Sequence, residues 1–104
     1  MTAKELAKQL KTAQAPWILD VRSGPEYRSG HIPRARHLPF WAASLNTSEL
    51  PPDRQTLIVL TCEHGPRAAL AVSMLRLRGY RNLALLEGHM AGWRRAKFPL
   101  DKTG

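Results

Sequence analysis

The sequence predicts an α/β fold, in which an open, mostly parallel sheet carries helices on both faces. Short apolar runs at 17–21, 56–61 and 83–86 have the length of buried strands, and helical patterns separate them. The run at 56–61 is almost continuously apolar, which is typical of a parallel strand that is covered on both faces. The alternation of strand and helix along the chain therefore favours a parallel sheet.

The helices are expected from apolar spacing and from residues that start or stop helices. Residues 3–11 place apolar side chains on one side, as a short amphipathic helix does. Pro25 suits the first turn of a brief helix that Gly30 ends, and Gly79 ends a longer one. We expect helices at 3–11, 23–29, 66–78 and 88–93.

Two further segments give weaker signals. Residues 36–38 are a candidate short strand, and residues 40–50 have a weakly helical pattern. Pro51 and Pro52 then turn the chain before the strongest strand begins.

The length of 104 residues predicts one domain that spans 1–104. A hydrophobic fraction of 43% and a charged fraction of 23% are ordinary for a globular protein. No apolar run approaches the ~20 residues that a membrane-spanning helix needs. The first residues form a charged amphipathic stretch and not the apolar core of a signal peptide. We therefore expect a cytoplasmic protein with no membrane partner.

The chain is basic, with 16 Lys and Arg against 8 Asp and Glu and a net charge of +8. The basic residues are scattered, and the sequence has no zinc finger, no RNP-like aromatic motif and no long basic run. The charge predicts a solvated surface that attracts anions in general. Direct binding to nucleic acid is not expected.

Cys62 is the only cysteine, which excludes an internal disulfide and a site with several cysteine ligands. His31, His37 and His89 lack the spacing of metal ligands, so we expect neither a metal nor a cofactor. A lone cysteine is by default a small buried side chain. Only its surroundings can identify it as a nucleophile.

The segment 62–67 joins the end of a predicted strand to the start of a predicted helix. Unpaired N–H groups at a helix start, curled around one sulfur, can stabilise a thiolate. Gly65 allows a sharp turn, Pro66 suits the first helical position but supplies no N–H, and Arg67 offers paired donors to an oxyanion. The alternative is that Cys62 merely ends a core strand while Arg67 lies on the surface.

Three motifs, in order and with the right spacing, make the chain similar to the rhodanese domain over roughly 17–99. The matching segments are 18–22, 26–27 and 30–33 for the first signature, 62–67 for the active-site loop, and 86–88 with Trp93 and Pro99 for the last signature. The resemblance implies a five-stranded rhodanese-like sheet. It also implies a sulfurtransferase that works by double displacement.

The resemblance carries site residues over by position. Cys62 is implied to be the nucleophile that holds the transferred sulfur as a persulfide. The donor is implied to be a small anion such as thiosulfate or a mercapto acid, and the acceptor cyanide or a thiol, including a protein thiol. The implied substrate-binding residues are Glu63, His64, Gly65, Pro66 and Arg67. The residues implied to brace the fold near the site are Asp20, Arg22, Glu26 and His31.

Four positions depart from the family pattern. Arg34 and His89 stand where the signatures usually have glycine. Glu63 follows the nucleophile directly, and we expect its charge to repel an anionic donor. His64 is expected to be an exposed loop histidine.

Other functions remain as alternatives. Cysteine-dependent phosphatases also use a Cys-loop-Arg cradle, but with five intervening residues, whereas only four separate Cys62 from Arg67. Non-catalytic rhodanese-like interaction modules commonly lack the cysteine that this chain has. The basic surface leaves open the attraction of an anionic sulfur donor, or docking of a protein or RNA-modification partner that receives the sulfur.

Overall fold

Four parallel strands form a single sheet in the computed structural model, which describes residues 1–103. The strands are β1 (Trp17–Asp20), β2 (Arg36–His37), β3 (Ile58–Thr61) and β4 (Leu83–Leu85). Their order across the sheet is β2-β1-β3-β4, which puts β1 and β3 in the middle. Asp20 at the end of β1 stands opposite Thr61 at the end of β3. The predicted open parallel sheet is confirmed.

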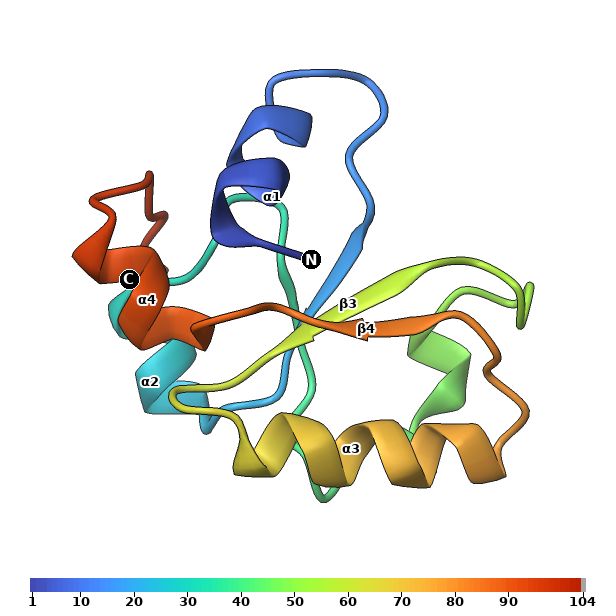
Figure 1. The fold of residues 1–104 in the computed structure, drawn as a ribbon. Helices are drawn as coiled ribbons and strands as arrows, with labels where there is room; N and C mark the ends of the chain where they lie inside the picture. Colours follow the sequence, from blue (N-terminus) through green and yellow to red (C-terminus); the bar gives the residue numbers. More distant parts are fainter. Residues whose placement is uncertain (104) are drawn as a thin grey trace.

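Helices cover both faces of this sheet. They are α1 (Ala3–Gln9), α2 (Gly24–Ser29), α3 (Pro66–Leu77) and α4 (His89–Arg95). Figure 1 shows α3 along the lower face, with α1 and α4 on the opposite side. The predicted arrangement is therefore confirmed, and the predicted ends agree with the observed ones to within two residues.

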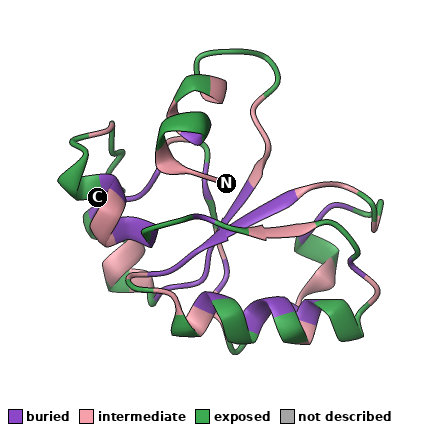
Figure 2. Cartoon of the chain, viewed as in Figure 1, coloured by how far each residue is buried: buried purple, intermediate pink, exposed green. Residues whose placement is uncertain are grey.

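The apolar residues of β3 alternate between two cores. Ile58 and Leu60 face the core between the sheet and α3, whereas Val59 faces the core between the sheet and the pair α1 and α4. The second core also contains Leu6 from α1 and Trp93 from α4. Figure 2 shows the central strands as the buried interior between these layers. The continuous apolarity of the 56–61 segment thus reflects burial on both sides.

The prediction that residues 83–86 form a buried strand is wrong for most of its length. Leu83 and Ala84 are half-buried, and Leu85 is 38% exposed. The cause is the position of β4 at the edge of the sheet, where β3 is its only neighbour within residues 1–103. Leu86, directly after the strand, is fully buried.

The expected fifth strand is also wrong for the part of the chain that the structure describes, because the sheet there has four. His31 and Asp101 instead form a single antiparallel bridge outside the sheet. Pro33 and Pro99, each two residues from the bridge, lack the N–H that a longer ladder requires. The pairing therefore does not extend from His31 and Asp101 toward Pro33 and Pro99.

Local residues account for the short helix and for the end of the long one. Ser23 and Glu26 form a capping box at the start of α2. Gly79 follows α3 with a φ of +91°, and its N–H donates to the carbonyl of Arg76. No helix within residues 1–103 is long and apolar enough to cross a bilayer.

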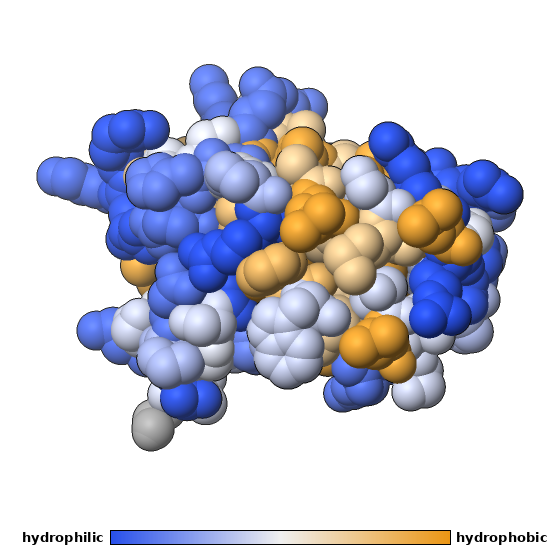
Figure 3. Space-filling view, turned by 90° about the horizontal axis from the view of Figure 1, so that it is seen from below, coloured by the Kyte–Doolittle hydropathy of each residue, from blue (hydrophilic) through white to orange (hydrophobic). Residues whose placement is uncertain are grey.

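The weakly helical segment 40–50 forms two 3₁₀ turns, η1 (Ala43–Leu45) and η2 (Thr47–Glu49). Together with the outer side of α3, this region leaves large apolar side chains on the surface, as the view from below shows (Figure 3). The exposed fractions are 63% for Trp41, 69% for Leu45, 49% for Leu70 and 87% for Leu77. The inner side of α3 packs into the core, so only its outer side remains exposed.

Candidate active site

The loop between β3 and α3 lies at the carboxyl end of the central strands, where parallel sheets usually bind ligands. β3 ends at Thr61, Cys62 follows at once, and α3 begins at Pro66. Only 1% of Cys62 is exposed. The cysteine is therefore held within the loop and is not a free surface thiol.

Two backbone N–H groups point at the sulfur of Cys62. Gly65 donates to Sγ at 3.0 Å and Ala68, in the first turn of α3, donates at 3.4 Å. Gly65 has a φ of +126°, which side-chain-bearing residues rarely adopt. These donors and the positive end of α3 can stabilise negative charge on one sulfur atom.

The start of α4 holds the other side of the loop. The N–H of Met90 donates to the carbonyl of Cys62 at 3.0 Å, and that of Ala91 to the carbonyl of Glu63 at 3.2 Å. N–H groups in the first turn of a helix have no partner within the helix, so they are available for such contacts. The loop is thus fastened to α4 as well as to α3.

His89 also contacts the loop, although it was not predicted to belong to the site. The N–H of Cys62 donates to His89 Nδ1 at 3.2 Å. His89 is 8% exposed and has a φ of +50°, consistent with a position that favours glycine. Burial, and then the charge of His64, hold the pKa of His89 below its usual value of 6.5. The only sequence signal for this role was its replacement of a signature glycine.

Glu63 lies between two arginines, so the charge that was expected to repel the donor is paired. Its Oε1 accepts a hydrogen bond from Arg22 at 3.4 Å, and its Oε2 contacts Arg94. Arg94 was not predicted, because it is 31 residues away in the sequence. The two guanidinium groups largely neutralise the carboxylate that follows the nucleophile.

Arg22 and Asp20 form a buried ion pair behind the loop. Arg22 is 2% exposed and Asp20 is fully buried. Arg22 Nε donates to Asp20 Oδ1 at 3.0 Å, and its NH2 group donates to Asp20 Oδ2 at 2.8 Å and to the carbonyl of Gly30 at 2.7 Å. This network connects the end of β1 to Glu63.

Arg67 binds Glu26 of α2. Its two terminal nitrogens donate to Glu26 Oε1 and Oε2 at 2.7 and 3.0 Å. The bonds from Arg67, followed by those from Ser23, lower the pKa of Glu26 to about 2. The same pairing raises the pKa of Arg67. Arg67 therefore links the loop to α2 and has two of its donors already occupied.

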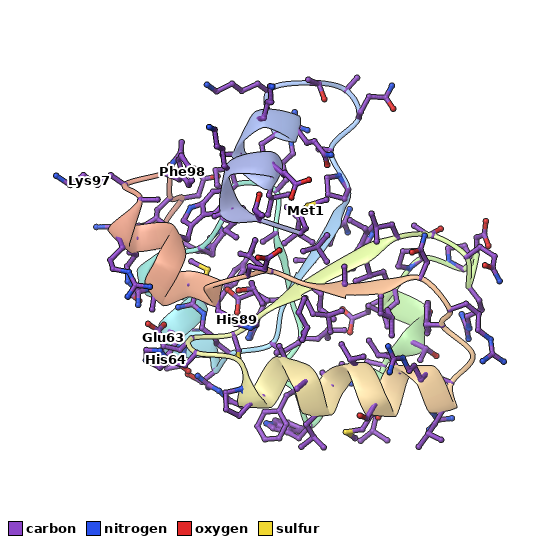
Figure 4. All side chains as sticks on the ribbon, viewed as in Figure 1. Met1, Glu63, His64, His89, Lys97 and Phe98 are labelled. Atoms are coloured by element: carbon purple, nitrogen blue, oxygen red, sulfur yellow. The ribbon has the colours of Figure 1, made fainter. Side chains whose placement is uncertain are left out.

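The remaining predicted residues lie on either side of this network. His31 stacks on Tyr27 with ring centroids 3.8 Å apart, and its Nδ1 is 2.8 Å from the carbonyl of Tyr27. His31 thus supports α2, which Arg67 in turn connects to the start of α3. His64 is exposed, as expected, and Figure 4 shows it with Glu63 and His89 at one end of the sheet.

A surface pocket of about 310 Å³ opens beside the loop. Its lining residues are Arg22, Glu26, Ser29, Gly30, Glu63, Arg94 and Leu100. A larger pocket, of about 680 Å³, lies around β2 and is lined by His31 but by no residue of 62–67. Among residues 1–103, no group of three or more His, Cys, Asp or Glu side chains is placed to hold a metal ion.

Residues 2–96 match the model of the rhodanese-like domain family. A crystal structure of a rhodanese-like domain protein from Staphylococcus aureus superposes with a TM-score of 0.85 at 26% identity, covering 100% of this chain and 97% of that one. The chain belongs to the rhodanese-like domain family. The resemblance noted in the sequence is thereby confirmed.

Several relatives in this family are named for sulfur transfer. A protein named sulfurtransferase from Allochromatium vinosum is 30% identical over 98 residues, which cover 94% of this chain and 90% of that protein. A protein named thiosulfate sulfurtransferase GlpE from Haemophilus influenzae is 29% identical, with 99% of both chains covered. The chain spans 55% of a longer, uncharacterised relative from Synechocystis, which is 34% identical over 101 residues.

Proposed function

We propose that the protein is a sulfurtransferase in which Cys62 carries the transferred sulfur as a persulfide. The donor is a small anion such as thiosulfate or a mercapto acid, and the acceptor is cyanide or a thiol. The observation that carries the proposal is the pair of N–H groups, from Gly65 and Ala68, on the sulfur of the only cysteine. The names of the relatives from A. vinosum and H. influenzae support the same reaction class.

In the first step the Cys62 thiolate attacks the outer sulfur of the donor. With thiosulfate, a bond forms between Sγ and this outer sulfur, and the original S–S bond breaks. Sulfite leaves with the bonding electron pair. The N–H groups around Sγ favour the thiolate before attack, and the same cradle suits the anionic outer sulfur of the persulfide afterwards.

In the second step the acceptor attacks the outer sulfur of the persulfide. Cyanide becomes thiocyanate, or a thiolate becomes a persulfide, and Cys62 leaves as the thiolate. The cycle returns the protein to its starting state. It calls for no metal and no cofactor.

The other loop residues have supporting roles in this proposal. Gly65 provides the turn, and Pro66 begins α3 without an N–H of its own. Glu63, His64 and Arg67 lie around the loop, where a donor approaches, although Glu63 and Arg67 are already paired. The net charge of +8 would draw an anionic donor toward this surface.

Mass spectrometry of the purified protein, after incubation with thiosulfate or mercaptopyruvate, tests the proposal. We expect one added sulfur at Cys62, which cyanide then removes as thiocyanate. The Cys62→Ser variant is the matched control and should gain no sulfur. Absence of an added sulfur with both donors would contradict the proposed function and favour a non-catalytic module.

A further inference from the structure

His89 stands apart from the other residues that hold the loop, because its contact depends on the protonation state of a side chain. The N–H of Cys62 can donate only to a ring nitrogen that has a free lone pair. The observed contact at 3.2 Å therefore assigns the neutral tautomer with hydrogen on Nε2. If Nδ1 were protonated, two donors would face each other.

The position of the ring supports a specific fit to the loop. A Cβ atom built on Gly65 would lie 3.1 Å from His89 Nε2, so the ring fills the space beside that glycine. One ring nitrogen thus contacts the first residue of the loop, and the other lies beside Gly65, the residue that donates to Sγ. His89 therefore lies against the loop at both Cys62 and Gly65.

We propose that His89 is a positioning residue of the Cys62 loop, which it holds through Nδ1 only while its imidazole is neutral. This inference rests on the proposed sulfurtransferase function. Protonation of His89 would remove the acceptor for the Cys62 N–H and loosen the loop that presents the sulfur. Sulfur transfer would then slow at acid pH because the loop is loosened, apart from any effect of protonating the thiol.

The electrostatic surroundings of the ring favour the neutral form. The nearby titratable or charged groups are Cys62, Glu63 and His64 on the loop, Arg67 at the start of α3, Arg94 and Arg95 on α4, and Glu87 before α4. Glu63 is engaged by Arg22 and Arg94, so its charge is not free to stabilise an imidazolium. Burial and the charge of His64 both lower the pKa of His89.

Two substitutions of His89 distinguish the effect of the hydrogen-bond acceptor from the effect of protonating the ring. Asparagine tolerates a positive φ and offers a carbonyl acceptor that does not titrate, so His89→Asn should keep the contact at every pH. Glycine suits the backbone but removes the acceptor, so His89→Gly should lose the contact at every pH. The wild type should behave like the asparagine variant above the pKa of His89 and like the glycine variant below it.

The first measurement is hydrogen exchange of the Cys62 amide by NMR, corrected for the intrinsic exchange rate at each pH. We expect the protection of the wild type to fall at least fivefold as the pH falls from 7.5 through the pKa of His89, whereas that of His89→Asn stays constant. His64→Gln should move the loss of protection to higher pH, because it removes the neighbouring charge. Constant protection in the wild type while His89 titrates, or an equal loss in His89→Asn, would overturn the inference.

The second measurement is kcat/KM for thiosulfate over the same pH range. Both proteins have the same loop and the same thiol, so the ratio of His89→Asn to wild type isolates the effect of the histidine. We expect this ratio to rise about fivefold toward acid pH, which corresponds to about 1 kcal/mol. A constant ratio, or one that falls, would show that the contact does not position the loop for catalysis. If neither the wild type nor His89→Asn transfers sulfur, the proposed function fails. The protection of the Cys62 amide still decides whether His89 holds the loop.

Discussion

Arg67 and Glu26 join the start of α3 to α2 through two hydrogen bonds, although the two residues are 41 positions apart in the sequence. The guanidinium would otherwise be free to meet a donor anion beside Cys62. Its pairing makes the loop part of a rigid frame that includes the capping box of α2. In the proposed function, Arg67 would therefore couple the orientation of the loop to the binding of the donor.

This pair should make stability depend on pH in the acid range. The pKa of Glu26 is lowered from 4.5 to about 2, so its contribution is fully present above about pH 4.5 and is lost as the pH falls toward 2. We expect the wild type to lose about 1 kcal/mol more than Glu26→Gln over this window, a value reduced for partial exposure. Urea unfolding at pH 5 and pH 2.5 measures the difference. Equal losses in the two proteins would contradict the assigned pairing.

Arg67→Ala should lower kcat/KM for thiosulfate by about tenfold, or about 1.4 kcal/mol. The variant frees the loop from α2 and leaves the Glu26 carboxylate unpaired near the site. Arg67→Lys keeps the charge but not the bidentate geometry, so it should recover only part of the loss. Steady-state kinetics of both variants provide the measurement. An unchanged kcat/KM in Arg67→Ala would assign Arg67 a purely structural role.

Cys62→Ser should abolish sulfur transfer and leave the fold intact. Serine is close to cysteine in size, and its oxygen can accept hydrogen bonds from the same N–H groups, but it cannot form the persulfide. Thiocyanate formation from thiosulfate and cyanide measures the activity, and circular dichroism with thermal unfolding checks the fold. Transfer at the wild-type rate would refute the assignment of Cys62.

Glu63→Gln should change thiosulfate kinetics by less than twofold, even at low salt. Its charge already interacts with Arg22 and Arg94, so a donor meets little net repulsion from it. The variant should instead lose about 1 kcal/mol of stability, because the buried Arg22 loses a charged partner. Arg94→Gln is the matched control, since it leaves the contact between Glu63 and Arg22 in place. A fivefold gain in kcat/KM at low salt would restore the repulsion model.

Aryl phosphates should not be hydrolysed at a useful rate. Only four residues separate Cys62 from Arg67, and the N–H groups of Gly65 and Ala68 converge on Sγ itself. This cradle suits one sulfur and not a phosphoryl group. Assays with p-nitrophenyl phosphate should therefore give equal rates for the wild type and Cys62→Ser. Turnover that depends on Cys62 would overturn this view of the loop.

The sequence predicted the elements and the loop well because both depend on local patterns. The apolar run of β3, the capping residues of α2 and the turn at Gly65 all act over a few positions. The partners of Glu63 and Arg67 were not predictable in this way, since 31 to 41 residues separate them and only the strand order brings them together. The exposure of β4 likewise follows from its place at the edge of the sheet, which its composition does not reveal.

The near-complete burial of Cys62 has a consequence for the chemical durability of the protein. With 1% exposure, the resting sulfur is shielded from bulky oxidants and from the thiols of other proteins. In the proposed persulfide, the added sulfur would lie about 2 Å from Sγ, which is the length of an S–S bond. The loop would thus shield Sγ of Cys62 in the resting protein, and the added sulfur would be the atom that an acceptor attacks. Disulfide-linked dimers should consequently form slowly in air. The chain has no second cysteine that could form an internal disulfide with Cys62 instead.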